Sequence, residues 1–390
     1  MEEFGIYVHI PFCKKKCYYC DFISFDCMEN KIDDYINSLI KEIDKKDIIE
    51  KSDDNVILKN FTGKKVTSIY IGGGTPSLIA SKYILKILNA IKNKYELKEN
   101  AEITIEVNPG TVTEEKLIDY KNAGINRLSI GLQSADDRIL KLIGRIHTYE
   151  QFLNTYNLAK KVGFKNINVD LMLAIPTQTE KELVDSIIKV VNLNPNHISL
   201  YSLILEENTK LEELVKNKEL ELIDDDTERK MYWKTKNLLK KNGYNHYEIS
   251  NFSKKGFESK HNMNCWNQEQ YIGYGLAAHS YFSNTRFSNT DDLNEYILNI
   301  NNDNINEIIE IEEVQDREKK AKEYMMLGFR KIKGISISDF ERKFRVHPLF
   351  YFRFELEKLE KEGLIEIDLD NILLTEKGLD LANQVFEEFV

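Results

Sequence analysis

The sequence contains no long hydrophobic run, no basic leader and no excess of positive charge. Nothing in it approaches the roughly 18 uninterrupted apolar residues of a membrane-spanning helix. The N-terminus MEEFGIYVHI carries neither the basic region nor the small-residue cleavage site of a signal peptide. We therefore expect a cytoplasmic protein without a transmembrane segment. The formal net charge of −10 argues against nucleic acid as a partner.

Cysteine is scarce and odd in number, which argues against a disulfide scaffold. The chain of 390 residues has only five cysteines. Four of them crowd near the N-terminus, at Cys13, Cys17, Cys20 and Cys27, while Cys265 stands far from the rest. Such crowding is typical of metal ligation by reduced thiols.

Short β-rich runs alternate with helical patterns along the first 245 residues. This alternation is typical of parallel βαβ units, and it predicts either a doubly wound sheet or a barrel-like (β/α)6 array. In both folds, functional residues gather at the carboxyl ends of the strands. The expected strands are residues 6–10, 66–73, 102–107, 127–132, 166–173 and 197–204.

The helices between these strands are indicated by apolar stripes and by end signals. Apolar residues recur at helical spacing over residues 32–43 and 83–91. Thr148 with Gln151, and Thr177 with Glu180, have the spacing of capping boxes at two later helix starts. Helices are expected to stop at Gly124, Gly163 and Gly243.

The rhythm fails after residue 245, and a different unit is expected at the C-terminus. Residues 246–312 read as a connecting segment that ends in an acidic, Asn-rich linker at 300–315. Beyond it, helical patterns at 317–331 and 348–362 precede a hairpin around Asp370 and Asn371, which suggests a winged-helix-like module over 313–390. Residues 336–390 hold 7 Lys and Arg against 13 Asp and Glu, net −6, so we do not expect this module to bind DNA.

The spacing CxxxCxxC of Cys13, Cys17 and Cys20 raises the question of the missing fourth ligand. A structural zinc site takes four ligands, so zinc would have to recruit Cys27 or His9. A [4Fe-4S] cluster held by three cysteines instead keeps one iron open for another molecule. S-adenosylmethionine (SAM) can chelate that iron through its amino and carboxylate groups, and an electron from the cluster then splits its sulfonium.

Several motifs in order resemble the radical SAM superfamily, and more narrowly its oxygen-independent coproporphyrinogen III oxidase-like family. They are YVHIPFCKKKCYYC at 7–20, IGGGTPS at 71–77, IEVNPG at 105–110, RLSIGLQS at 127–134, GRIH at 144–147 and the strand around Asp170. The resemblance covers nearly the whole chain. It implies an α/β fold: a partial (β/α)6 radical SAM barrel over residues 1–245, with a small α+β winged-helix-like C-terminal domain.

The resemblance also implies the binding residues. Cys13, Cys17 and Cys20 would hold the [4Fe-4S] cluster. No catalytic residue is predicted. The residues that would contact SAM are Tyr7, Tyr19, Gly73, Gly74, Thr75, Glu106, Gln133, Arg145 and Asp170.

Two features favour the haem chaperones of this family, which are HemW-like, over its oxidases. The oxidases carry a further cysteine two residues after the third ligand, where this chain has Phe22. The chain also begins almost directly at the first strand. The resemblance therefore implies a protein that delivers haem to haem-requiring proteins. An anaerobic SAM-dependent coproporphyrinogen III oxidase and a radical SAM enzyme with another substrate remain the alternatives.

The haem chaperones also carry an HNxxYW motif, which is matched incompletely at residues 261–266. His261, Asn262 and Trp266 match it, and Cys265 replaces the tyrosine. Imidazole and thiolate are axial haem ligands, and an indole can wall a porphyrin, so His261, Cys265 and Trp266 are candidates to bind haem. The expected partners are a haem-accepting protein and a flavodoxin or ferredoxin reductant, with peripheral membrane association only through the recipient.

Overall fold

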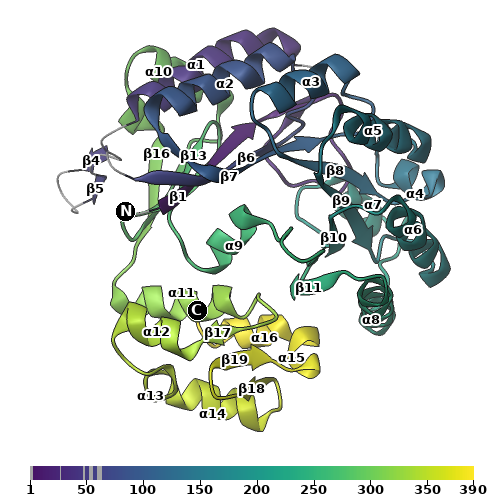
Figure 1. Ribbon diagram of the computed structural model, residues 1–390, viewed down its shortest axis with the longest axis vertical. Helices are drawn as coiled ribbons and strands as arrows, with labels where there is room; N and C mark the ends of the chain where they lie inside the picture. Colours follow the sequence, from purple (N-terminus) through teal and green to yellow (C-terminus); the bar gives the residue numbers. More distant parts are fainter. Residues whose placement is uncertain (1–2, 27, 47–48, 52–55, 59–63) are drawn as a thin grey trace.

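The computed structural model describes the chain except residues 1–2, 27, 47–48, 52–55 and 59–63 (Figure 1). A 12-stranded mixed sheet runs through it in the order β11-β12-β10-β9-β8-β7-β6-β1-β13-β14-β15-β16. Its centre is parallel and confirms all six predicted strands. These are β1 (Glu3–Ile10), β6 (Lys65–Gly73), β7 (Glu96–Val107), β8 (Arg127–Gln133), β9 (Asn166–Leu173) and β10 (His197–Ser202).

Helices cover one face of this sheet (Figure 1). The main core lies between that face and the helices, because Ile, Val and Leu alternate along each parallel strand and point towards them. Since the covering helices lie on one side only, the fold is a partial barrel and not a doubly wound sheet. The helices are α1 (Ile32–Lys45), α2 (Ser81–Lys94), α3 (Glu114–Asn122), α4 (Asp137–Leu142), α5 (Tyr149–Val162), α6 (Glu180–Leu193), α7 (Lys210–Lys216) and α8 (Asp225–Lys241).

The helix ends confirm most of the predicted signals and correct one. Thr148 and Gln151 form the capping box of α5, which ends at Gly163 with φ 93°. The predicted box of Thr177 with Glu180 is wrong, because α6 is capped by Thr179 with Glu182. Thr177 has φ 65°, whereas a capping residue needs the extended backbone that Thr179 has. None of the described helices is long and apolar enough to cross a membrane.

Strands from the later part of the chain extend both edges of the sheet. The acidic linker predicted at residues 300–315 is wrong, because residues 309–314 form an edge strand that pairs Ile311 with Phe287. Buried Ile308 and Ile309 anchor it, which an isolated linker would not need. These elements are β11 (Asn245–Glu248), β12 (Asn251–Ser253), α9 (Lys260–Trp266), β13 (Tyr271–Tyr274), β14 (His279–Phe282), β15 (Thr285–Asn289), α10 (Leu293–Asn301), the 3-10 turn Ile305–Ile308 and β16 (Ile309–Val314).

A second cluster of buried apolar residues lies within residues 321–389 and forms the core of the C-terminal unit, residues 317–390. The predicted hairpin around Asp370 is confirmed, but the helix expected at 348–362 is interrupted at Phe352, which packs its buried ring on Phe340 and Phe389. The elements are α11 (Arg317–Gly328), β17 (Ile335–Ser336), α12 (Ile337–Phe344), α13 (Pro348–Tyr351), α14 (Arg353–Lys361), β18 (Ile365–Ile367), β19 (Asn371–Leu374), α15 (Glu376–Asp380) and α16 (Ala382–Glu387).

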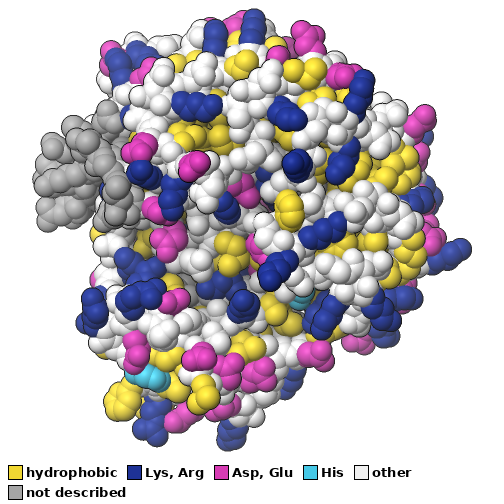
Figure 2. Space-filling view, viewed as in Figure 1, with side chains coloured by type: hydrophobic (Ala, Val, Ile, Leu, Met, Phe, Trp, Pro, Cys, Tyr) yellow, Lys and Arg dark blue, Asp and Glu magenta, His cyan; other side chains and the backbone are white. Residues whose placement is uncertain are grey.

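Basic and acidic side chains are interspersed on the visible face of the molecule (Figure 2).

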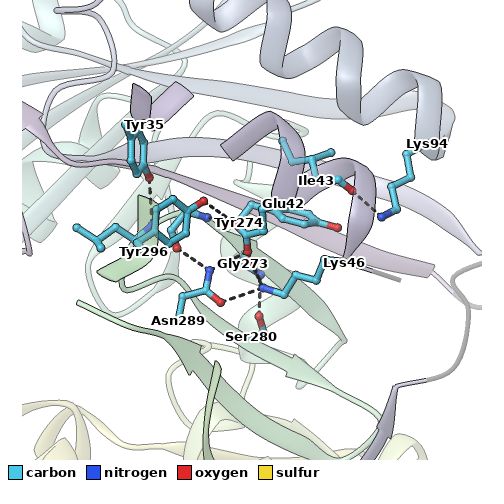
Figure 3. Close-up of polar contacts among 12 residues, drawn as sticks. Tyr35, Glu42, Ile43, Lys46, Lys94, Gly273, Tyr274, Ser280, Asn289 and Tyr296 are labelled. Carbon is cyan, nitrogen blue, oxygen red and sulfur yellow. Dashed lines mark hydrogen bonds and ion pairs between the residues drawn. The ribbon is translucent and has the colours of Figure 1, made fainter. Parts of the chain in front are cut away.

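A buried polar cluster joins α1 to the turn after β13 (Figure 3). Glu42 is fully buried and accepts hydrogen bonds from Lys46 Nζ at 2.8 Å, Gly275 N at 2.8 Å, Asn289 Nδ2 at 2.8 Å and the Tyr296 hydroxyl at 2.6 Å. Lys46 Nζ also donates to the Gly273 carbonyl and to Asn289 Oδ1, both at 3.0 Å. The cluster therefore holds the carboxyl end of β13 beside the outer helix layer.

Candidate functional site

The sheet face opposite the helices carries mostly polar residues. Along each parallel strand these residues alternate with the apolar ones of the core. They include Ser68 and Tyr70 on β6, Glu102 and Glu106 on β7, Arg127 and Ser129 on β8, Asn168 and Asp170 on β9, and His197 and Ser199 on β10. The inside of the partial barrel is therefore built to hold polar groups.

A cavity of about 380 Å3 lies where this polar face meets the carboxyl ends of the strands. It collects the three clustered cysteines and all the predicted SAM residues except Tyr7. The exception, Tyr7, points its hydroxyl at His9 Nδ1 (2.9 Å) and stacks on Tyr70 behind the cavity wall. The predicted residues in the wall are Cys13, Cys17, Cys20, Tyr19, Gly73, Gly74, Thr75, Glu106, Gln133, Arg145 and Asp170.

The cysteine loop is held to the barrel by backbone hydrogen bonds on both sides. Two short strands, β2 (Phe12–Cys13) and β3 (Phe25–Asp26), pair with each other at its base. Tyr18 N donates to the Ile143 carbonyl at 3.0 Å, and the Tyr18 carbonyl accepts from Leu211 N at 2.7 Å. The three thiols are thus presented to the cavity by a backbone fixed at several points.

The described surroundings of the thiols do not provide His9 as a fourth zinc ligand. No group of three or more His, Cys, Asp or Glu in the described residues is arranged to hold a metal ion. Both ring nitrogens of His9 are engaged, with Tyr7 and with the Ile23 carbonyl at 2.8 Å, so His9 is not a free fourth ligand. The other candidate for a fourth ligand, Cys27, lies outside the described residues.

Polar groups border two of the sulfurs. The Thr75 hydroxyl lies 3.5 Å from Cys13 Sγ, and Arg145 Nη1 lies 3.5 Å from Cys17 Sγ. Burial raises the pKa of the Cys13 thiol and raises that of Cys20 to about 11. These two free thiols are therefore protonated at neutral pH, and metal binding has to displace their protons.

The glycine turn after β6 passes so close to the cysteine loop that side chains are excluded. A Cβ on Gly74 would lie 3.1 Å from Cys13 Sγ and 3.0 Å from the Phe12 carbonyl oxygen. Gly73 has φ 109°, and a Cβ there would meet the His9 ring at 2.6 Å. The amides of Gly73, Gly74 and Thr75 donate to Glu106, Ile10 and Phe12 respectively. Because these amides are engaged within the chain, they are not free to bind an anionic group.

Glu106 is fixed at the end of β7 by two donors. The Tyr70 hydroxyl donates to it at 2.9 Å and Gly73 N donates at 3.2 Å. Burial raises the pKa of Glu106 to about 7, and the nearby Asp170 adds to the rise. Burial also raises the pKa of Asp170, which accepts from Ser129 at 3.1 Å and Asn168 at 2.7 Å. A cationic ligand between these carboxyls would favour their charged forms.

Arg145 and Gln133 form the opposite wall. Arg145 Nη2 donates to Asn108 Oδ1 at 2.5 Å and to the Gly131 carbonyl at 2.6 Å. Its Nε is buried with no hydrogen-bond partner in the described chain, while the guanidinium as a whole borders the cavity. Gln133 has φ 70°, a conformation that residues other than glycine rarely adopt and that is often found at binding sites.

The three haem candidates lie elsewhere, on α9, and do not line the cavity. His261 is 9% exposed, its Nδ1 lies 3.0 Å from the Ser68 hydroxyl and its ring packs on Tyr70. Burial lowers the pKa of His261 to about 4, so the imidazole is neutral at pH 7. Trp266 is covered by the Arg330 guanidinium, 4.4 Å from its ring centre. Burial raises the pKa of Cys265 to about 11.

The α9 motif is enclosed by the C-terminal unit. Gln268 Nε2 donates to Glu323 at 2.7 Å, and Lys331 Nζ donates to Asn267 at 2.7 Å. Figure 1 shows α9 between the sheet and α11. His261 itself is buried against Ser68 and Tyr70 of the sheet, so a ligand as large as a porphyrin reaches it only if this packing opens.

Several residues of the cavity were not predicted from the sequence. Tyr70 and Asn108 hold Glu106 and Arg145 in place. Asn108 belongs to the IEVNPG motif, and Tyr70 lies at the inward-facing position of its strand, so both could have been found from their motif or register. Among the additional wall residues are Lys15, Asp21, Phe22, Ser129, Met172, Tyr201, Leu203, Ile204 and Glu206.

Comparison with protein-family models gives two matches. Residues 7–189 match the radical SAM superfamily, and residues 315–381 match the HemN C-terminal domain. The first match contains the whole candidate site up to Asp170, and the second lies within the C-terminal unit.

Curated relatives match over nearly the full length. The chain is 37% identical to "Heme chaperone HemW" of Lactococcus lactis, over 98% of this chain and 96% of that protein. It is 36% identical to "Heme chaperone HemW" of Bacillus subtilis, over 98% of both chains. Among solved structures, coproporphyrinogen III oxidase (HemN) from Escherichia coli superposes with a TM-score of 0.83 and 22% identity, covering 100% of this chain and 90% of that one. This last likeness shows the fold.

Proposed function

The chain belongs to the radical SAM superfamily and, within it, to the family of HemW-like haem chaperones, and from this membership we propose that it binds haem and delivers it to haem-requiring proteins. The observation that carries the proposal is identity above 35% along nearly the whole chain with proteins named heme chaperone. The fold alone does not separate a chaperone from an oxidase, because HemN shares it.

Membership of the superfamily implies a [4Fe-4S] cluster and SAM. We assign the cluster to Cys13, Cys17 and Cys20, whose thiols border the cavity. When bound, the cluster supplies an electron that can split the SAM sulfonium. The thiols hold the iron, and the Thr75 hydroxyl and Arg145 guanidinium beside two of them offset the negative charge of the thiolates.

We assign SAM to the polar wall of the same cavity. The carbonyl oxygens at Gly73 and Gly74 would accept from its ammonium group, and the Arg145 guanidinium, which borders the cavity, would donate to its carboxylate. Glu106 and Asp170 accept from hydroxyl or ammonium donors of the ligand. Tyr19 and Gln133 complete the wall, and Tyr7 acts from behind it by orienting His9.

His261, Cys265 and Trp266 remain candidates for haem contact. In favour of His261, the hydrogen bond of Nδ1 to Ser68 orients the ring and leaves Nε2 for iron. Haem ligation there requires α9 to move away from the sheet residues that bury His261. The partners proposed with this function are a haem-accepting protein and a flavodoxin or ferredoxin reductant, with membrane association only through the recipient.

Haem titration of the anaerobically reconstituted protein tests the function. We expect a stoichiometric Soret band and transfer of the haem to an apo-haemoprotein. Incubation with coproporphyrinogen III, SAM and a reductant is expected to yield no protoporphyrinogen. Iron and sulfide analysis of a Cys13→Ala, Cys17→Ala, Cys20→Ala variant should show loss of the cluster. A wild-type protein that retains no haem, or that forms protoporphyrinogen, would falsify the chaperone proposal.

A further inference from the structure

Two exposed apolar side chains border the mouth of the cofactor cavity. Phe22 is 61% exposed and Ile204 is 66% exposed, and both belong to the cavity wall. Leu203 and Tyr201, which is 40% exposed, lie beside Ile204 in the same wall. Exposed apolar groups gathered at the entrance of a pocket are typical of a binding surface.

We propose that Phe22 and Ile204 form an apolar seat for the porphyrin ring of haem at the cavity mouth, with Lys15 facing its propionates. This inference rests on the proposed haem-binding function and assigns it a site that is separate from the α9 motif. It also gives a physical role to Phe22, the residue that stands where the oxidases of the family have a cysteine.

The seat is built on a fixed backbone, so its apolar groups cannot easily withdraw from water. The Phe22 carbonyl accepts from Lys16 Nζ at 3.0 Å and from the Ser24 hydroxyl at 3.2 Å. On the other side, Leu203 N donates to the Leu173 carbonyl at 3.0 Å. The loop after β10 is tied to the cysteine loop by the bond from Leu211 N to the Tyr18 carbonyl. A preformed surface binds without a large ordering cost.

The mouth combines exposed apolar groups with one lysine, and because Asp21 and Glu206 also line this wall, Lys15 is the group that can face an anion there. Lys15 borders the cavity, with its Nζ 5.4 Å from the Tyr18 ring centre and no ion pair among the described residues. In a chain of net charge −10, such a cation is a local attraction for carboxylates. Phe22 and Ile204 offer the apolar contact, and Lys15 offers the charge.

The size of the cavity points to the same place. Its volume of about 380 Å3 is at the low end for ligand pockets, and its polar wall suits the cluster and SAM. A porphyrin is larger and mostly apolar, so the mouth is the part of this site that remains for it.

Titrations with haem and with metal-free protoporphyrin IX test the seat, because only haem can gain from an axial ligand. The full chain carries its reconstituted cluster in every sample. We expect both porphyrins to bind the wild type, and a Phe22→Ser, Ile204→Ser variant to bind both at least about tenfold more weakly. A tenfold loss corresponds to some 50 to 60 Å2 of lost apolar contact at about 25 cal/mol per Å2. Lys15→Gln should weaken binding a few-fold at low salt and have little effect at high salt.

Two further variants keep the test specific. Phe350→Ser removes an exposed aromatic group of the C-terminal unit, 87% exposed, and should bind both porphyrins as the wild type does. The second variant is Ile204→Ser alone, which changes no residue near the cysteines in sequence. If its iron content is unchanged, its cluster is intact, and weaker porphyrin binding then reports on the apolar seat.

The outcomes separate this inference from the function on which it rests. Wild-type affinity in the Phe22→Ser, Ile204→Ser variant would overturn the seat while leaving the chaperone proposal intact. The seat is also overturned if protoporphyrin IX does not bind and His261→Ala abolishes haem binding, because the α9 motif is then the site. A wild type that binds neither porphyrin would overturn both proposals.

Discussion

Replacement of Lys46 by methionine should destabilise the protein strongly. The change keeps the length of the side chain but removes the positive charge next to the fully buried Glu42 carboxylate (Figure 3). Breaking a buried ion pair by removing one partner typically costs about 3 to 5 kcal/mol. Glu42 keeps its bonds from Gly275, Asn289 and Tyr296, which lowers the cost. The Gly273 carbonyl loses a donor, which adds to it. We therefore expect a loss of about 3 kcal/mol in the free energy of unfolding.

The double variant Glu42→Gln, Lys46→Met sharpens this prediction. No charge remains buried in it, so its loss of stability should be smaller than the sum of the two single losses, which marks coupling between the residues. Lys45→Met is the matched control on the same helix. Lys45 is paired with Asp303 at the surface with 47% of its side chain exposed, so the change should cost less than about 1 kcal/mol.

Urea unfolding followed by circular dichroism measures these differences, and hydrogen exchange shows where they act. The amides of Gly275 and Leu276 donate to Glu42 and to the Tyr35 hydroxyl. They should exchange faster in Lys46→Met than in Lys45→Met. The reasoning is refuted if Lys46→Met unfolds within about 0.5 kcal/mol of the wild type, or if the single losses add up fully in the double variant.

Two further changes test the candidate site itself. Burial raises the pKa of Glu106 from 4.5 to about 7, so the folded protein keeps a proton there that the unfolded chain has released. Stability should therefore fall as the pH rises from about 5 through 7. Urea unfolding measured across that range should show a smaller fall in Glu106→Gln than in the wild type. If the two proteins have the same pH profile, the carboxyl of Glu106 is not buried as described. Gly74→Ala places a Cβ against Cys13 and the Phe12 carbonyl, so its iron content after reconstitution should drop. Gly243→Ala is the control: its φ of 82° adds backbone strain, but its Cβ meets no atom within 4 Å, so the protein should keep its iron. Equal iron contents in the two variants would show that the turn at Gly74 can shift to accommodate a Cβ.

The parallel strands were predictable because their signal is local. Each run of alternating or continuous Ile, Val and Leu lies next to a helix with its own apolar stripe, and the two signals support each other. The short strands β13 and β16 lack that support. Residues 271–274 are bounded by glycine and become a strand through parallel pairing with β1, some 260 residues earlier in the chain. Residues 309–314 are mostly acidic and therefore resemble a linker, but they form a strand because they pair with β15, and this pairing decides which of their side chains are buried.

The candidate site, too, was predictable in part from local motifs and in part only from tertiary contacts. The cysteine spacing, the glycine turn and the residues at strand ends could be assigned from motifs, since parallel strands bring their carboxyl ends to one edge. The positions of Tyr70 and Asn108 as supports of Glu106 and Arg145 depend on contacts between neighbouring strands. The separation of His261 from the cavity could not be read from its motif, because it depends on how α9 packs between the sheet and the C-terminal unit.

The sequence by itself determined the identity of the thiols, the positions of the parallel strands along the chain and the family of the chain, because these depend on residue types at fixed short spacings. Only the tertiary structure decided that Phe22 and Ile204 meet at one cavity mouth while His261 is enclosed. Packing between segments distant in the chain sets which side chains remain exposed, and no local pattern carries that information.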